Sequence, residues 1–208
     1  DFQYVMTYGL ESHTSFLEEG LRQWTEQRFE RQLNERMAAV GFPIFPYFEF
    51  RNYNQPESGI LIDVFDPRYS NGYASVRNRI GLLLENHIYK PYKQRVLATI
   101  EMLKACAQIL GEEQQTLTAL IRQADARVAS SDFRKQPLAF EFVPANRDSV
   151  MVDFLSWERD TTISDLSGAP WVTHNYEKPK TVRTSLITSF DSTISVQLPE
   201  AYILMPQW

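Results

Sequence analysis

The first part of the chain changes its hydrophobic period within about fifteen residues. Residues 2–8 alternate aromatic and β-branched side chains, which predicts a strand. Apolar residues then recur mostly every three or four positions over residues 17–40, which predicts a helix that Gly41 ends. Ser15 and Glu18 have the spacing of a capping box at the start of this helix. Its opposite face is expected to be solvated and carries Glu26, Arg28, Glu30, Arg31, Glu35 and Arg36.

An irregular segment and a short apolar run follow this helix. Prolines and glycines interrupt residues 42–79 so often that we expect turns and short extended pieces, and long connections of this kind are often functional loops. Residues 80–84 (IGLLL) are apolar without alternation, which predicts a strand covered on both faces. Three polar residues, Glu85, Asn86 and His87, come directly after it.

Two helices and a β-rich tail are expected in the rest of the chain. Helical spacing of apolar residues over 91–111 and 112–129 predicts a helical hairpin or a kinked pair that meets at Gly111. After Ser130 the composition changes, and short runs rich in β-branched and aromatic residues predict strands. These strands cover residues 138–143, 150–157, 171–175, 181–188, 193–198 and 201–205.

Composition excludes several classes of protein. The 208 residues are 43% hydrophobic, which is enough apolar surface for a folded domain. The 21 basic and 26 acidic side chains form no basic block, so nucleic acid is not an expected partner. No stretch has the roughly 20 apolar residues that a membrane span needs. The single cysteine, Cys106, excludes an internal disulfide and is expected to be a buried thiol. The chain starts at Asp1 rather than at a methionine, so the lack of a signal peptide is uninformative.

A carboxylate at the end of a buried strand is the most informative chemical feature. Ligands of open α/β sheets bind at the carboxyl ends of strands, so Glu85 is a candidate catalytic residue and His87 a candidate to line the same crevice. The alternative is a solvated glutamate, or one paired with Lys90 or Arg79. Residues 47–73 interleave aromatic and arginine side chains, which favours core packing or a wall that binds peptide or sugar. The sequence contains neither a glycine-rich phosphate loop nor a G-x-S-x-G elbow, which argues against nucleotide binding and serine catalysis.

One stretch of the chain carries a family resemblance: residues 69–87 (YSNGYASVRNRIGLLLENH), continued by residues 90–96 (KPYKQRV). It resembles the C-terminal part of a zinc carboxypeptidase domain of the peptidase M14 family. The resemblance is strongest to bacterial members in which an asparagine-arginine pair precedes an apolar strand that ends in glutamate. Residues 1–8 are similar to the strand that follows the third zinc histidine in that branch.

The resemblance implies a division of the chain into three parts. Residues 1–111 correspond to the C-terminal portion of the carboxypeptidase-like domain, residues 112–136 to a connecting helix and linker, and residues 137–208 to the β-rich extension of some members. The expected fold class is therefore α/β: part of a mixed-sheet α/β/α domain followed by a β-rich extension.

The resemblance also assigns roles to residues. Glu85 corresponds to the catalytic glutamate, which accepts a proton from a water that a zinc ion activates and passes it to the leaving amine. In the family an H-x-x-E pair and a later histidine hold the zinc before this glutamate in the sequence. The only H-x-x-E here, at residues 174–177, follows Glu85, so the Zn²⁺ ligands are expected upstream of Asp1, and this fragment alone is expected to be inactive.

The resemblance suggests three residues that contact substrate. Tyr73 corresponds to the mobile active-site tyrosine, with Tyr69 as the alternative. Arg79, with its neighbour Asn78, either contacts substrate or braces the loop, and we favour bracing. His87 is the third candidate.

The expected function is that of a secreted or periplasmic zinc metallocarboxypeptidase, of which this chain is a part. The expected partner is a peptide substrate, hydrolysed at its C-terminus. The alternative is a non-catalytic module that binds peptide or glycan on a degenerate carboxypeptidase fold.

Overall fold

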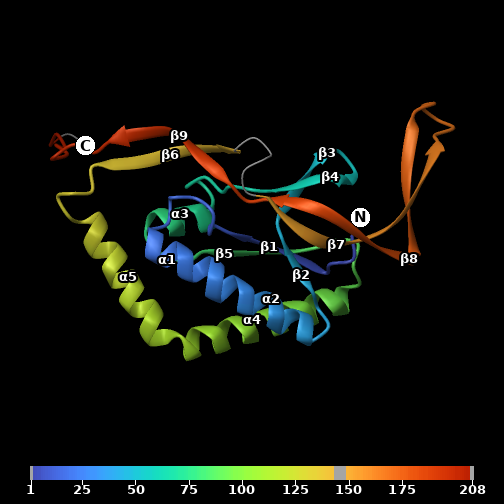
Figure 1. The fold of residues 1–208 in the computed structure, drawn as a ribbon, viewed down its shortest axis with the longest axis horizontal. Coiled ribbons are helices and arrows are strands. Elements are labelled where there is room, and N and C mark those ends of the chain that lie inside the picture. The colour runs from blue at the N-terminus through green and yellow to red at the C-terminus, as the bar shows by residue number, and fades with distance from the viewer. Residues whose placement is uncertain (1, 143–148, 207–208) are drawn as a thin grey trace.

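The first 128 residues form both strands and helices, and only strands follow among the described residues (Figure 1). The structure is a computed structural model that describes residues 2–142 and 149–206. Its strands are β1 (Met6–Leu10), β2 (Ile44–Pro46), β3 (Phe48–Asn52), β4 (Gln55–Ile62), β5 (Leu82–Asn86), β6 (Lys135–Phe142), β7 (Ser149–Ile163), β8 (Pro170–Ile187) and β9 (Phe190–Gln197). Its helices are α1 (Glu19–Trp24), the π-helical η1 (Thr25–Glu30), α2 (Arg31–Ala39), α3 (Ser70–Val76), α4 (Tyr92–Glu112) and α5 (Gln114–Val128). The general α/β class is confirmed.

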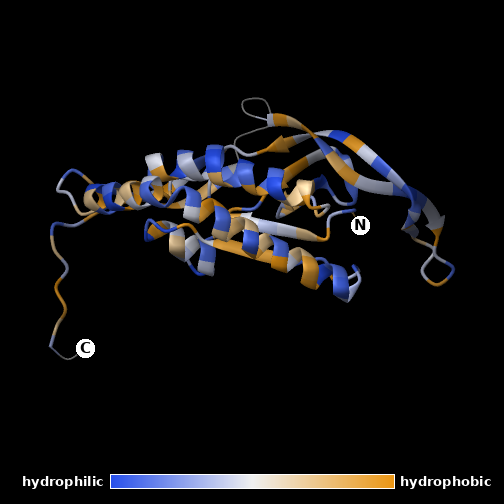
Figure 2. Ribbon diagram, turned by 90° about the horizontal axis from the view of Figure 1, so that it is seen from below, coloured by the Kyte–Doolittle hydropathy of each residue, from blue (hydrophilic) through white to orange (hydrophobic). Residues whose placement is uncertain are grey.

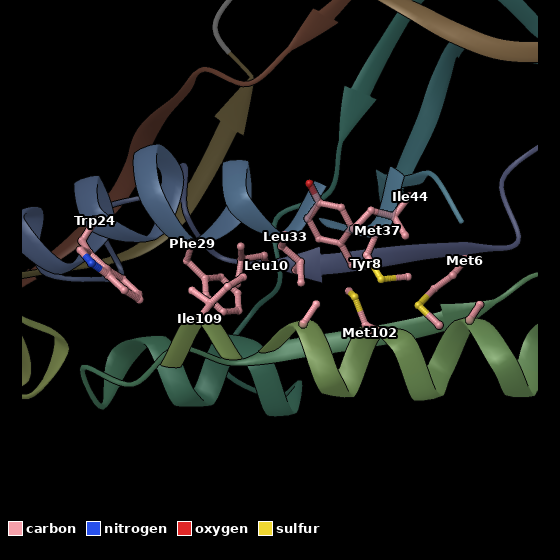
Figure 3. Packing of buried hydrophobic residues seen from close by; sticks show 12 residues of the cluster. Met6, Tyr8, Leu10, Trp24, Phe29, Leu33, Met37, Ile44, Met102 and Ile109 are labelled. Atoms are coloured by element: carbon pink, nitrogen blue, oxygen red, sulfur yellow. The ribbon is translucent and has the colours of Figure 1, made fainter. Parts of the chain in front are cut away.

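A small mixed sheet and two helices form the larger core. The sheet has the order β2-β1-β5, with β1 parallel to β2 and antiparallel to β5. Met6, Tyr8 and Leu10 share one face of β1, because alternate residues of a strand do so, and they pack on α2 and α4 (Figure 3). From the helices, Leu33, Met37, Met102 and Ile109 meet them without solvent exposure. Each such apolar side chain contributes about 1.5–3 kcal/mol when it is fully buried.

The first predicted helix is confirmed, but its start and its middle differ from the prediction. Glu18 is the N-cap, since its carboxylate accepts a hydrogen bond from the Gly20 N–H at 2.8 Å. The capping box led by Ser15 is therefore wrong. Between α1 and α2 the chain widens into the π-helical η1, which changes the direction of the side chains that follow. Glu30, predicted on the solvated face, is mostly buried, with 14% of its side chain exposed.

Residues 42–79 contain three short strands, β2, β3 and β4, which agree with the expected short extended pieces, and one helix, α3, which was not expected. Some of the residues that suggested turns lie inside strands. Pro56 belongs to β4, and its carbonyl accepts a hydrogen bond from Thr184 Oγ1 at 2.7 Å. Gly59, also in β4, has a φ of +112° and a neighbour, Ser185, 3.0 Å from where a Cβ would lie. This backbone conformation requires glycine.

A second sheet joins the two ends of the chain. Its order is β3-β4-β8-β7, and β4 pairs with β8 in parallel, with Ile60 opposite Leu186. Strands from residues 1–111 and from residues 137–208 therefore share hydrogen bonds. Phe154 of β7 is fully buried at the centre of an aromatic cluster. The rings with centroids 5.2–6.2 Å from its own are Phe2, Tyr4, Phe45, Phe48 and Phe50.

The β-rich tail has fewer and longer strands than predicted. The predicted strands at 171–175 and 181–188 are parts of one strand, β8, which forms a long hairpin with β7 that extends beyond the sheet (Figure 2). Strands β6 and β9 pair as a separate ribbon. Residues 201–205 belong to no strand that the structure describes, so the predicted strand there is wrong. Val143, the last residue of the strand predicted at 138–143, lies outside the described residues.

The two long helices α4 and α5 form a kinked pair rather than a hairpin, and Figure 1 shows them joined at an open angle near Glu113. Among the residues that the structure describes, no helix has both the length and the apolar character needed to cross a bilayer.

Candidate functional site

Glu85 lies near the carboxyl end of β5, on the face of the sheet opposite to α2 and α4. Directly paired residues of an antiparallel ladder share a face, and Glu85 lies opposite Thr7 while Leu84 lies opposite the core residue Tyr8. The side chain of Glu85 is exposed. Because β5 is at the edge of its sheet and is only partly buried, the prediction of a strand covered on both faces is wrong.

The surface beside Glu85 is acidic. Tyr47 follows β2 directly, and its backbone N–H donates a hydrogen bond to Tyr8 O at 2.7 Å. Burial raises the pKa of the Tyr47 phenol, and the negative charges of Glu85, Asp63 and Glu49 raise this pKa further. Across residues 2–142 and 149–206, no ion pair or side-chain hydrogen bond involves Glu85. The alternative in which Lys90 or Arg79 neutralises this carboxylate is therefore not observed in the described part of the chain.

His87 lies just beyond β5, beside the beginning of the described chain. Its backbone N–H donates to Val5 O at 2.9 Å, and its ring packs edge-on against Phe2 with the centroids 4.6 Å apart. Burial, and next the positive charge of Lys90, lower the pKa of His87 to about 4. The imidazole is therefore neutral at neutral pH. Lys90 Nζ donates to Phe2 O at 2.5 Å and lies over the ring of Trp157.

Arg79 is held in a bidentate ion pair with Asp125 of α5. Nη1 and Nη2 each lie 3.0 Å from a carboxylate oxygen of Asp125, and Asn78 Nδ2 donates to the same carboxylate at 3.2 Å. This pairing lowers the pKa of Asp125 and raises that of Arg79. Asn78 has a φ of +54° and forms the turn that leads to β5. In this arrangement Arg79 and Asn78 brace the loop against α5.

The four residues predicted from the sequence do not converge on one point. Glu85 and His87 are near the carboxyl end of β5, whereas Arg79 precedes its amino end. Tyr73 lies on α3 with 58% of its surface exposed, and the alternative, Tyr69, is 46% exposed beside Phe65. Glu85 and His87 are thus two residues apart at one end of β5, and Glu85 and Tyr69 both lie close enough to Tyr47 to raise the pKa of its phenol.

The structure contains a buried polar cluster between β1 and η1 that was not predicted from the sequence. Glu30 accepts hydrogen bonds from Tyr8 Oη at 2.7 Å and from Ser12 Oγ at 3.1 Å, and His13 Nε2 lies 3.9 Å away. Burial raises the pKa of Glu30 and lowers that of His13 to about 4. His13, interpreted as a residue of the surface or helix flank, is instead mostly buried. The run of polar residues 11–15 between two apolar elements was the only available signal.

Glu11 is a second buried carboxylate of this region. It accepts hydrogen bonds from Phe65 N at 2.6 Å and from Thr14 Oγ1 at 2.8 Å, so it ties the end of β1 to the segment after β4. Burial raises its pKa to about 7. The Glu30 cluster borders a cavity of only about 10 Å³, room for about one water molecule. Both carboxylates therefore have structural partners rather than space for a substrate.

A larger groove of about 250 Å³ lies between α1, α5 and the start of β6. The Glu18–Arg127 ion pair, 2.5 Å long, lies in its wall. Its apolar lining consists of Phe16, Leu17, Val76, Val128, Phe133 and Pro137. None of the four predicted site residues lines this groove or the smaller cavity.

The described residues contain no group of three or more histidine, cysteine, aspartate or glutamate side chains placed to hold a metal ion. His174 and Glu177, the only H-x-x-E, belong to the strand β8 rather than to a helix. None of the known protein families, curated proteins or solved structures with which the chain was compared matches it.

Proposed function

We propose that the chain is part of a zinc metallocarboxypeptidase and that Glu85 is its general base. The observation that supports this most directly is the placement of Glu85: an exposed carboxylate, fixed by β5 near its carboxyl end, with no cation paired to it among the described residues. A base must be available to a reacting water, and an ion-paired glutamate would not be. The resemblance of residues 69–96 to the peptidase M14 family supplies the reaction class.

The described side chains alone do not fit a zinc ion, so the proposal assigns the ligands to residues that precede Asp1 in the complete protein. When bound, zinc lowers the pKa of a water and polarises a carbonyl. The contribution of this chain is proton transfer: Glu85 accepts the proton of the attacking water and donates it to the leaving amine of a peptide C-terminus.

Two neighbours are proposed to contact the peptide. His87, neutral at neutral pH, offers hydrogen bonds without adding charge beside Glu85. Tyr73 offers an exposed aromatic ring, with Tyr69 as the alternative. We assign to Arg79 the role of bracing the loop before β5, since its guanidinium is already ion-paired with Asp125. A secreted or periplasmic location remains part of the proposal.

The test is Glu85→Gln in the complete, zinc-loaded protein, with Glu49→Gln as the matched control. Both substitutions remove one negative charge from the acidic surface around Tyr47, but only Glu85 would transfer a proton. We expect kcat for a peptide with a free C-terminus to fall about 10²–10⁴-fold in Glu85→Gln and to change less than about 3-fold in Glu49→Gln.

Three results would contradict the proposal. Unchanged turnover in Glu85→Gln would exclude this residue as the base. Equal losses in both variants would mean that the surface acts through its charge alone. Tight peptide binding without turnover in either the wild type or Glu85→Gln, in a protein that takes up no zinc, would instead support the binding module.

A further inference from the structure

The groove between α1, α5 and the start of β6 can accept apolar side chains. Its volume is about 250 Å³, whereas an apolar cavity of about 150 Å³ is large enough to bind benzene. Val76, Phe133 and Pro137 of its lining are only half-buried, and Val128 is 36% exposed. Apolar surface therefore remains uncovered inside the groove, with room for about two more side chains.

The segment after β9 presents a run of apolar side chains to solvent. Residues 201–205 (AYILM) belong to no strand that the structure describes, and we call them the apolar arm. The exposed fractions of Tyr202, Ile203 and Leu204 are 79%, 85% and 88%. Figure 2 shows the arm projecting from the body of the molecule. Because a contiguous exposed apolar segment usually marks a site of interaction, the arm has the character of a docking peptide.

The arm is anchored at the rim of the groove. The Leu198 N–H donates a hydrogen bond to Arg134 O at 2.9 Å, and Gln197 lies opposite Lys135 in the ribbon of β6 and β9. Both chain neighbours of Arg134, Phe133 and Lys135, line the groove. The arm begins only three residues after Leu198, and each residue of an extended chain spans at most about 3.6 Å. Its apolar side chains are therefore within reach of the groove.

Charge and chain direction indicate which side chains of the arm face the groove. Glu200 precedes the arm, and the chain bends there. Lys135 lies in the wall of the groove, and neither residue forms an ion pair within the described part of the chain. A contact between Glu200 and Lys135 would turn Tyr202 and Leu204 to the side of the groove, because alternate residues of an extended segment share a side. Ile203 would then face solvent.

We propose that the apolar arm docks in the groove of its own chain, with Tyr202 and Leu204 against the apolar lining and Glu200 beside Lys135. The groove of the same chain is favoured over that of a second copy, because a short flexible linker gives the arm an effective concentration in the millimolar range. Docking would remove from solvent the apolar surface of both the arm and the groove, which drives the association.

The docked arm would also contact the support of the loop before β5. Asn78 lines the groove, and its Nδ2 donates a hydrogen bond to Asp125 of α5 at 3.2 Å. The arm would thus connect the end of the β-rich region with the loop that leads to β5. The inference goes beyond the proposed function and does not depend on it, since Glu85 does not line the groove.

Thiol labelling at two neighbouring positions of the arm tests the proposal. Leu204→Cys and Ile203→Cys are each made in a Cys106→Ala background, so that the thiol in the arm is the only one in the chain. The two positions are almost equally exposed in the undocked arm, at 88% and 85%. We expect maleimide to label the thiol at position 204 at least about 10-fold more slowly than the thiol at position 203, because only the first enters the groove.

A matched pair of valines tests the groove. Val128→Asp places a charge in its lining, and Val150→Asp makes the same change on β7, at a valine that is 61% exposed and outside the groove. Both valines are exposed, so both variants should keep the wild-type circular dichroism. In the Leu204→Cys protein, Val128→Asp should raise the labelling rate to that of position 203, whereas Val150→Asp should leave it slow.

The protein without substitutions gives an independent measurement, which covers the case in which Leu204→Cys itself releases the arm. Methyl NMR should show nuclear Overhauser effects between Leu204 and Val128, which arise only between groups in close contact.

Equal labelling at positions 203 and 204, together with no Overhauser effect between Leu204 and Val128, would overturn the proposal. Slow labelling at position 204 that becomes fast on dilution would overturn it in favour of a second copy. Slow labelling that neither valine variant changes would place the arm on another surface and exclude the groove. The proposed catalytic role stands or fails separately, through the turnover of Glu85→Gln.

Discussion

Single buried charges decide how this protein responds to pH. Glu11 and Glu30 are carboxylates with folded-state pKa values above the ordinary range, and burial is the first cause in each case. His13 has a lowered pKa for the same reason. A raised acid and a lowered base act in opposite directions on stability, so each group must be isolated by substitution.

The Glu11→Gln variant isolates one of these groups. Because the pKa of Glu11 is raised to about 7 in the folded state, its contribution to stability is fully present below the unfolded-state pKa and is lost as pH rises through 7. Glutamine keeps an acceptor for the Phe65 N–H, and its amide N–H donates to Thr14 Oγ1, which reverses the direction of the hydrogen bond that Thr14 donates to the carboxylate. We expect Glu11→Gln to match the wild type in urea unfolding at pH 5 and to be more stable by up to about 3 kcal/mol at pH 8. A difference that does not change between the two pH values would contradict this.

At the candidate site, the position of Glu85 at the end of a strand could be predicted from the sequence, but its surroundings could not. That a strand ends near Glu85 followed from the apolar run before it and from the polar residues after it. The exposure of this carboxylate, and its lack of a paired cation among the residues that the structure describes, did not follow, because both depend on which strands flank β5. Likewise, the partner of Arg79 lies on α5, 46 residues away, and no local pattern specifies a contact over that separation.

At the scale of elements, two glycines in helices have opposite roles. Gly72 of α3 lies against the carbonyl oxygens of Phe65 and Asp66, where a Cβ would overlap with backbone atoms. Gly111, near the end of α4, has no neighbouring atom within 4 Å of where its Cβ would lie. The first position excludes any side chain, whereas the second only weakens the helix.

Alanine at the two positions should therefore shift the melting temperature in opposite directions. We expect Gly72→Ala to cost about 1–3 kcal/mol, because the backbone around residues 65 and 66 must move. We expect Gly111→Ala to add about 0.5–1 kcal/mol, since alanine favours the helix and restricts the unfolded chain. Calorimetry of both variants at one pH checks the signs, and a stabilising Gly72→Ala would mean that α3 packs less closely on this loop.

The helices could be predicted from the sequence because their stabilising contacts leave a regular local pattern, as at Leu33 and Met37. Within residues 42–79, neither the length of strand β4 nor the helix α3 could be predicted in this way. Pro56 and Gly59 read as interruptions, yet β4 accommodates both through its pairing with β8, whose residues come more than a hundred positions later. Pairing with a strand that is distant in the sequence thus outweighs local turn propensity.

At the scale of the whole molecule, Phe154 is the main packing link between the tail and the N-terminal region. It belongs to β7, and its ring contacts aromatic residues from the chain start and from β3. The β-rich tail is thus integrated with residues 1–111 through both a shared sheet and a shared core.

Truncation of this ring should destabilise the whole protein rather than the tail alone. We expect Phe154→Ala to lower the free energy of unfolding by about 3–5 kcal/mol in a single urea transition. Leu166→Ala, at a residue of the hairpin tip that is 98% exposed, should change it by less than about 0.5 kcal/mol. Two separate transitions in the Phe154→Ala variant would show that the tail and the N-terminal region unfold independently.

The parallel pairing of β4 with β8 also has a consequence during synthesis. Thr184, which bonds to Pro56, comes 128 residues after it. At about 5–20 residues per second, a ribosome needs about 6–26 s to make the intervening chain. During that time the edge of β4 that later pairs with β8 has no partner strand, although its other edge can pair with β3. Chaperones that shield exposed strands have their longest opportunity to act on the nascent protein in this interval.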